Sequence, residues 1–423
     1  MQETTSPTLK PSTKALFRAR IFLLICGFVT KSNGIFLAIN QGWFGLDYTR
    51  TMLAPLCFFF ASFFIAPIAG DLLHRFGYKK GMIAGLLMCA VSCCLLYVTY
   101  INKQYVLFLA SIFLLGGGVK FMLVAGPSYA IVFGPKETES GRLSATQAFY
   151  SIGSLVAPGV LLWIFSSEST DKPSVVAFSY IAFFLAWMAI CWGIYRIKKL
   201  PVREETIVYP AKKGIFDIFP PFTLSLGAGF TAMFMYMGIE VCMDSFLVKF
   251  LHAPEGGGLS LQKALSLFSL YYLGFVVGRL IGAPVLNRIP LSMALLVNSV
   301  AAIATFAVGM YLPPEAVFIM IVVLGLCNSV MYPLILAIGV KLENAPPSKV
   351  VGFLSTAAIG GALFPVLQGY LADTMGLRFS FILPVFGYVA LFMYGIFVRR
   401  KEIALFKEKE VTFFQEKSSE QEN

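Results

Sequence analysis

Long apolar runs alternate with short polar connections from about residue 20 to residue 398. Each run holds about 20 residues, which is the length of an α-helix that crosses the hydrocarbon core of a bilayer. The runs lie at 20–43, 52–71, 80–100, 105–133, 143–165, 175–195, 219–250, 263–284, 291–312, 315–340, 350–371 and 378–398. This pattern predicts an all-α membrane protein with twelve transmembrane helices.

An internal repeat divides these runs into two sets of six. The stretch Ile152–Pro158 is echoed by Ile359–Pro365, and Ala130-Ile131 by Ala337-Ile338, at the same offset of 207 residues (359 − 152 and 337 − 130). A duplicated transporter has this organisation, with its binding site between the halves. We therefore expect two pseudo-symmetric six-helix bundles, organised as a cytoplasmic segment 1–19, a bundle 20–195, a basic cytoplasmic linker 196–218, a second bundle 219–398 and a cytoplasmic tail 399–423.

Composition and charge agree with a membrane location. The chain is 58% hydrophobic and 13% charged, too apolar for a soluble domain of 423 residues. If both termini are cytoplasmic, 25 of the 33 Lys and Arg residues lie on that side, six on the far side and two within the membrane. The positive-inside rule thus predicts a multi-pass protein of the plasma (inner) membrane with cytoplasmic termini. The net charge of +11 then reflects contact with lipid headgroups, and we expect no nucleic-acid partner.

Cysteine and histidine usage argues against an enzyme. All eight cysteines fall in apolar runs, where a thiol behaves as a small hydrophobic group. His74 and His252, the two histidines of the chain, lie in separate connections without a carboxylate cluster at metal-binding spacing. No phosphate-binding loop or hydrolase motif occurs in the sequence. We expect no catalytic residues, no metal and no cofactor.

Two lysines interrupt the apolar runs. Lys31 and Lys120 each lie near the middle of a run, at a depth where a charged side chain is costly and by default marks a functional site. Two acids, Glu240 and Asp244, are spaced i, i+4 in the seventh run and so share one helix face. Because an unpaired buried charge costs several kcal/mol, we expect these four groups to have partners inside the bundle.

The segment from Gly70 to Lys80, Gly-Asp-Leu-Leu-His-Arg-Phe-Gly-Tyr-Lys-Lys, resembles the signature loop of the major facilitator superfamily. Other stretches are similar to the fucose and glucose/galactose symporter branch of that superfamily, namely 134–138, 142–143, 147–149, 238–240, 278–279, 328–333 and 359–373. The resemblance implies a gating loop on the cytoplasmic side. Its residues would be Gly70, Asp71, Arg75, Gly77 and Lys79, with Arg279 and Arg288 in the second half.

The same resemblance implies alternating access, a small polar solute such as a hexose, and a coupled ion, a proton or sodium. We expect the protein to be a monomer. Asn33, Gln147 and Glu240 match polar residues of the family. Where the family has acids in the first and fourth spans this chain has Gly34 and Leu123, and Tyr150 stands in place of a family Asn, so the proton-handling acids are absent. Lys31 and Lys120 each lie three residues before those gaps, on nearly the same helix faces. The candidate substrate or coupling residues are Lys31, Asn33, Lys120, Gln147, Tyr150, Glu240, Asp244 and Asn328.

Several roles for the charged residues stay open on sequence grounds. They could form interhelical ion pairs that never touch the substrate. The lysines could instead receive a small organic anion or sugar acid. A third alternative keeps a neutral sugar and uses a lysine or Glu240 as the titrating group, and a fixed lysine could also replace the driving ion. An efflux transporter of the same superfamily is a further alternative, because fold alone does not determine the cargo.

Overall fold

The computed structural model describes residues 13–46, 48–133, 135–164, 172–197, 219–254, 258–309 and 317–421, and all regular elements in these ranges are helices. Most of the linker expected at 196–218, and residues 1–12 of the N-terminal segment, lie outside the described residues. The N-terminal half contains α1 (Thr13–Phe44), α2 (Tyr48–Phe76), α3 (Tyr78–Asn102), α4 (Tyr105–Val132), η1 (Lys136–Thr138), α5 (Glu139–Ile164) and α6 (Lys172–Tyr195). The C-terminal half contains α7 (Leu224–His252), α8 (Leu261–Val285), α9 (Leu291–Gly309), α10 (Val317–Leu342), α11 (Pro347–Thr356), η4 (Ala357–Ile359), α12 (Gly360–Met375), α13 (Leu377–Ser380) and α14 (Ile382–Gln421).

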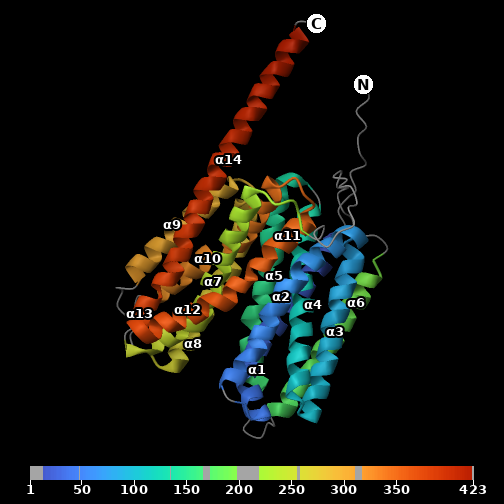
Figure 1. Cartoon of the computed structure of the whole chain (residues 1–423), viewed down its shortest axis with the longest axis vertical. Coiled ribbons are helices and arrows are strands. Elements are labelled where there is room, and N and C mark those ends of the chain that lie inside the picture. The colour runs from blue at the N-terminus through green and yellow to red at the C-terminus, as the bar shows by residue number, and fades with distance from the viewer. Residues whose placement is uncertain are drawn as a thin grey trace.

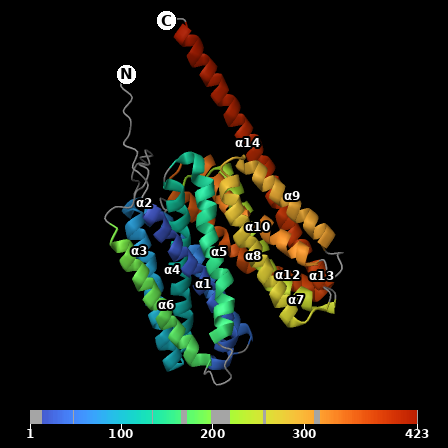
Figure 2. The same ribbon diagram turned by 180° about the vertical axis from the view of Figure 1, so that it is seen from behind.

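The two halves form separate helix bundles that stand side by side (Figures 1 and 2). The repeat seen in the sequence corresponds to equivalent packing within each half. A Cβ atom on Gly153 would lie 1.9 Å from the carbonyl oxygen of Leu24, and one on Gly360 would lie 2.2 Å from that of Phe234. These glycines, 207 residues apart, allow α5 to touch the backbone of α1 and α12 to touch that of α7.

The eleventh and twelfth spans differ in detail from the expected continuous helices. The eleventh is interrupted by the 3₁₀ turn η4, between α11 and α12. The described C-terminal tail is helical, because α14 continues without a break to Gln421, well beyond the expected end of the twelfth span at residue 398. Figure 1 shows this helix projecting from the bundle.

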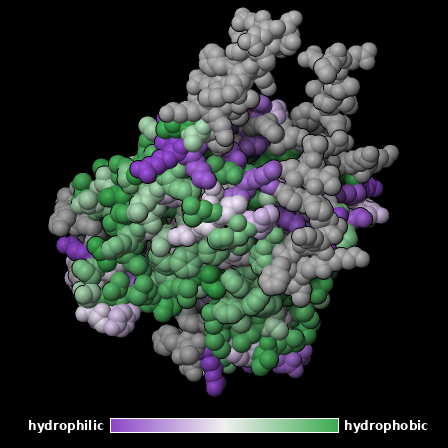
Figure 3. All heavy atoms as spheres, turned by 45° about the horizontal axis from the view of Figure 1, so that its top comes forward, coloured by the Kyte–Doolittle hydropathy of each residue, from purple (hydrophilic) through white to green (hydrophobic). Residues whose placement is uncertain are grey.

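The outer surface is suited to a bilayer. Ten of the described segments are long and apolar enough to cross a membrane. α1 and α5, with 32 and 26 residues, are not among them, so the count of twelve stays a prediction at these two helices. Large apolar side chains such as Phe64, Phe178 and Leu185 are more than half exposed. In Figure 3 hydrophobic residues make up most of the surface that is coloured by hydropathy. The protein is thus an integral, multi-pass membrane protein.

The halves touch mainly at one end, which we call the closed end: the end where α2 meets α3, α4 meets α5, α8 meets α9 and α10 meets α11. There α2 packs on α11, and α5 packs on α8. A Cβ on Gly141 would lie 2.1 Å from the carbonyl oxygen of Ala283, so the two backbones are in direct contact. Toward the opposite end, which we call the splayed end, the two bundles diverge (Figures 1 and 2).

Candidate functional site

An ion pair joins the two halves between the middle parts of α1 and α7. Lys31 Nζ lies 2.7 Å from Asp244 Oδ2. Tyr272 of α8 completes a triangle: its hydroxyl donates to Asp244 Oδ1 and accepts a hydrogen bond from the lysine. The Lys31 and Asp244 side chains keep 28% and 20% of their surface exposed, so the ion pair is mostly buried but remains partly accessible to solvent. The positive charge of α1 is therefore balanced by an acid of the other half.

Lys120 lies in a different environment. It is 5% exposed, and no hydrogen bond or ion pair of its ammonium is found within the described part of the chain. Glu240, on the opposite half, is close enough to interact with it electrostatically. Glu240 also interacts with Asp244, Lys31 and Arg279. The buried Lys120 ammonium and this carboxylate of the other half thus influence each other without a direct ion pair among the described residues.

Arg279 ties the halves together closer to the closed end. The sequence resemblance placed it in the gating loop, and the structure places it inside α8, where it is almost fully buried. Its Nε donates to the carbonyl oxygen of Ser329 at 2.8 Å, and one terminal nitrogen donates to the carbonyl oxygen of Gln147 at 3.0 Å and to the Ser151 hydroxyl. One guanidinium thus bonds α10 of its own half and α5 of the other.

We expect Arg279→Leu to lower thermal stability markedly, because the buried Ser329 carbonyl oxygen loses its donor and the link from α8 to α5 of the other half is lost. The residue four positions after Ser329 is Pro333, which has no backbone N–H to replace that donor. Each unsatisfied buried group costs about 1–3 kcal/mol. Thermal unfolding of the purified protein in detergent measures the effect, and Arg288→Leu is the matched control because Arg288 is exposed in the turn after α8. An Arg279→Leu melting temperature equal to that of the control would show that these bonds contribute little.

The remaining polar candidates are distributed between the interface and the interior of each half. The Gln147 side chain is buried at the interface, and its Nε2 has no hydrogen-bond partner among the described residues. Tyr150, a turn further along α5, interacts electrostatically with Glu240 and Arg279. Asn33 accepts a 3.0 Å hydrogen bond from Tyr180 of α6, within the N-terminal half. Asn328 is held within the C-terminal half by three tyrosines, Tyr236, Tyr271 and Tyr388.

The predicted gating residues gather around the α2–α11 contact at the closed end. Asp71 is buried and pairs with Arg75 at 2.7 Å and with Lys349 of the C-terminal half at 3.4 Å. Gly70 makes room for this contact, since a Cβ there would lie 2.5 Å from the carbonyl oxygen of Ser348. Gly77, between α2 and α3, has φ of 83°, a conformation that glycine adopts without strain.

The other two gating candidates take no part in this cluster. Lys79 Nζ lies 5.5 Å from the centroid of the Tyr195 ring, within the N-terminal half. Arg288 is exposed.

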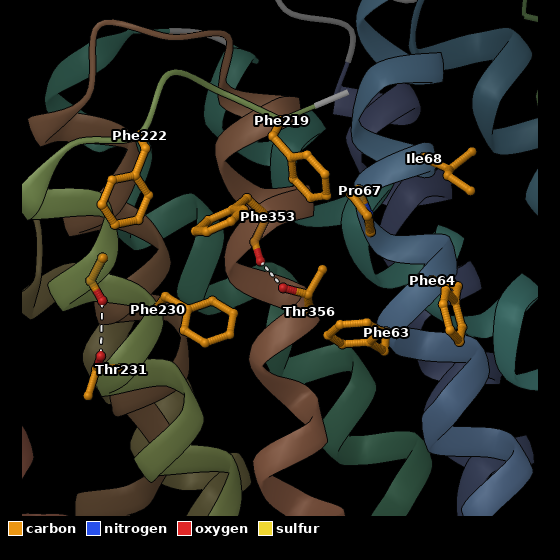
Figure 4. Close-up of a pocket in the computed structure, with 11 residues that line it drawn as sticks. Phe63, Phe64, Pro67, Ile68, Phe219, Phe222, Phe230, Thr231, Phe353 and Thr356 are labelled. Atoms are coloured by element: carbon orange, nitrogen blue, oxygen red, sulfur yellow. Dashed lines mark hydrogen bonds between the residues drawn. The ribbon is translucent and has the colours of Figure 1, made fainter. Parts of the chain in front are cut away.

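An apolar crevice of about 860 Å³ lies beside this contact, lined by residues of α2, of α7 and the segment before it, and of α11 (Figure 4). It is lined by Phe63, Phe64, Pro67, Ile68, Phe219, Phe222, Gly227, Phe230, Thr231, Phe353 and Thr356. Both threonine hydroxyls donate to carbonyl oxygens of their own helices, Thr231 to Gly227 and Thr356 to Phe353. Its wall therefore offers hydrocarbon and aromatic surface, which suits lipid chains and not a hydrophilic solute.

Sequence reasoning did not single out Tyr272, Ser151 or Lys349. Each contacts a predicted residue across the interface: Tyr272 holds Lys31, Ser151 holds Arg279, and Lys349 holds Asp71. The tyrosine pair Tyr271-Tyr272 in an otherwise apolar span was the available signal, because buried phenol groups need hydrogen-bond partners.

Comparison with known proteins identifies the family to which this fold belongs. The sequence profile of the Major Facilitator Superfamily matches residues 21–356. The chain belongs to the major facilitator superfamily. The glucose/galactose transporter of Brucella abortus biovar 1 (strain 9-941) is 33% identical over 387 residues, covering 90% of this chain and 93% of that protein. The L-fucose-proton symporter of Escherichia coli (strain K12) is 24% identical over 400 residues, covering 86% and 88%.

The fold of this superfamily member agrees with solved structures. The crystal structure of the major facilitator transporter FucP in the outward conformation superposes with a TM-score of 0.78 at 22% identity, covering 92% of this chain and 98% of that one. The all-α membrane fold and the resemblance to the fucose and glucose/galactose branch are thus confirmed.

Proposed function

We propose that this protein moves a sugar across the membrane by alternating access, with the solute held between Lys120 of the N-terminal half and Glu240 of the C-terminal half. The relatives named above include a glucose/galactose transporter and an L-fucose-proton symporter, matched over most of their lengths. The observation that supports the site is the buried Lys120 ammonium, which has no bonded partner within the described chain and interacts electrostatically with Glu240 of the other half.

The chemistry of this pair suits a polyol. An ammonium only donates hydrogen bonds and a carboxylate only accepts them, whereas a sugar hydroxyl does both. A hexose between the halves can accept from Lys120 and from the unbonded Gln147 Nε2, and donate to Glu240. Both halves then hold the same solute, which lets the site be presented to either side as the halves rock.

We also propose the orientation. The start of α1 and the end of α14 lie on the side of the closed end, and the positive-inside distribution supports a cytoplasmic location for that side. The splayed end then faces outward in a plasma membrane. The protein would work as a monomer, and no second chain is needed to complete the site described here.

The experiment is uptake into proteoliposomes of radiolabelled glucose, galactose and fucose, with a sugar acid such as galacturonate in a parallel arm. We expect saturable uptake of a neutral hexose. Lys120→Gln and Glu240→Gln should each lower it by about tenfold or more, because a hydrogen bond to a charged group is worth about 1.5–3 kcal/mol. Lys80→Gln, at an exposed position, is the control. Uptake of the sugar acid alone, lost in Lys120→Gln, would contradict the proposal and identify an anion transporter.

A further inference from the structure

The carboxylate of Asp244 already has a counter-ion that is part of the chain. Lys31 Nζ lies 2.7 Å from one of its oxygens and the Tyr272 hydroxyl donates to the other. Because Lys31 also donates to that hydroxyl, the three groups form a closed ring of interactions. Both oxygens of the acid are engaged, one of them by a full positive charge.

This arrangement matters for ion coupling. A transporter driven by a cation needs an acidic group in the membrane that is empty in one part of the cycle and holds the cation in another. A cation approaching Asp244 would have to displace the Lys31 ammonium or be placed beside it, and like charges repel. The ammonium therefore occupies the position that a coupling cation would take.

The charged groups around Asp244 also argue against the binding of a further cation there. The groups around Asp244 are Glu240 on its own helix, Tyr271 and Tyr272 on α8, and Lys31 on α1. Arg279 on α8 influences Glu240. Lys120 on α4 and Tyr150 on α5 lie near Glu240. Three cations, Lys31, Lys120 and Arg279, surround two acids, Glu240 and Asp244, so this region has no net negative charge with which to attract a further cation.

We propose that Lys31 is a built-in substitute for the transported cation, so that this chain carries its solute without a coupling ion, and that removing Lys31 turns Asp244 into a binding site for a proton or sodium ion. The first part depends on the transport function proposed above. The second part concerns the protein alone and is tested without any solute.

The test that needs no solute uses purified protein and thermal unfolding. Lys31→Gln should gain about 3–5 °C in melting temperature when sodium replaces choline at constant ionic strength, or when the pH is lowered, because a ligand that binds the folded state stabilises it. The wild type and Lys31→Gln/Asp244→Asn should show neither gain. A Lys31→Gln protein that does not respond to sodium or pH, or that responds equally without Asp244, would overturn the inference. The sodium and pH arms identify which cation binds.

The transport test uses proteoliposomes with an imposed proton or sodium gradient. The wild type should equilibrate its sugar at a rate that neither gradient changes, whereas uptake by Lys31→Gln should rise tenfold or more with one of them. Lys80→Gln should behave as the wild type. Gradient-driven accumulation by the wild type would overturn the inference. If no sugar is carried at all, the proposed function fails, and the thermal measurement still decides the assignment of Lys31.

Discussion

Gly70→Leu should reduce transport by about 100-fold while leaving the helices in the membrane. At this position a Cβ would lie 2.5 Å from the Ser348 carbonyl oxygen and 3.2 Å from the Cα of Gly352, and both contacts are backbone atoms that cannot turn aside. Overpacking of this kind costs about 1–3 kcal/mol and at times more. Since each 1.4 kcal/mol shifts an equilibrium about tenfold, the closed end would be open most of the time. Initial uptake rates in proteoliposomes measure the effect.

Gly159→Leu serves as the control, because nothing lies within 4 Å of a Cβ at that position. It makes the same change in a helix without touching the other half. Reactivity of a cysteine introduced at the exposed Lys80 should not differ between the variants, whereas one introduced at the buried Ser348 should react faster in Gly70→Leu. Wild-type transport by Gly70→Leu would show that the α2–α11 contact need not form during the cycle.

Asp244→Leu should destabilise the protein by about 2 kcal/mol, and Lys31→Leu/Asp244→Leu should recover most of that loss. Breaking an ion pair by removing one partner leaves the other charge uncompensated in a sheltered site, whereas replacing both partners by apolar groups does not. Groups in direct contact show coupling energies of about 0.5–3 kcal/mol in such double-mutant cycles. Melting temperatures of the four proteins in one detergent give the coupling.

One result of this double-mutant cycle would contradict the expectation. If the effects of Lys31→Leu and Asp244→Leu simply add, the 2.7 Å contact contributes nothing to the stability of this conformation. Tyr272→Phe refines the result, since it removes one hydroxyl of the triangle and leaves the ion pair in place. We expect its effect to be smaller than that of Asp244→Leu.

Periodicity and charge pattern predicted the fold because a bilayer enforces them. A spanning helix must be apolar over about 20 residues, so the runs are visible without knowledge of their neighbours. The 207-residue repeat likewise corresponds to a physical requirement, since Gly153 and Gly360 both face a backbone carbonyl at close range. The 3₁₀ turn η4 was not predicted, because the repeat counterpart of its residues lies in an unbroken α5.

The site was harder to predict because sequence spacing gives a helix face and not the rotation of that helix against its neighbours. Lys31, Glu240 and Asp244 were singled out by the cost of their charges, and the structure places them together. Asn33 and Asn328 were chosen by family likeness, and their amides bond tyrosines of their own halves. The sequence did not predict a role for Tyr272, because a tyrosine in an apolar span is common. Its role depends on Lys31 and Asp244, which lie far away in the chain.

The length of the Lys31 side chain bears on how the two bundles move. They are in backbone contact at the closed end, and Lys31 joins them again at mid-depth through a stem of four methylene groups. With a shorter side chain the ion pair would break as α1 and α7 shift, but the lysine side chain can extend or shorten its reach by rotation about its own bonds. The Lys31–Asp244 ion pair can therefore persist while the two bundles move relative to each other.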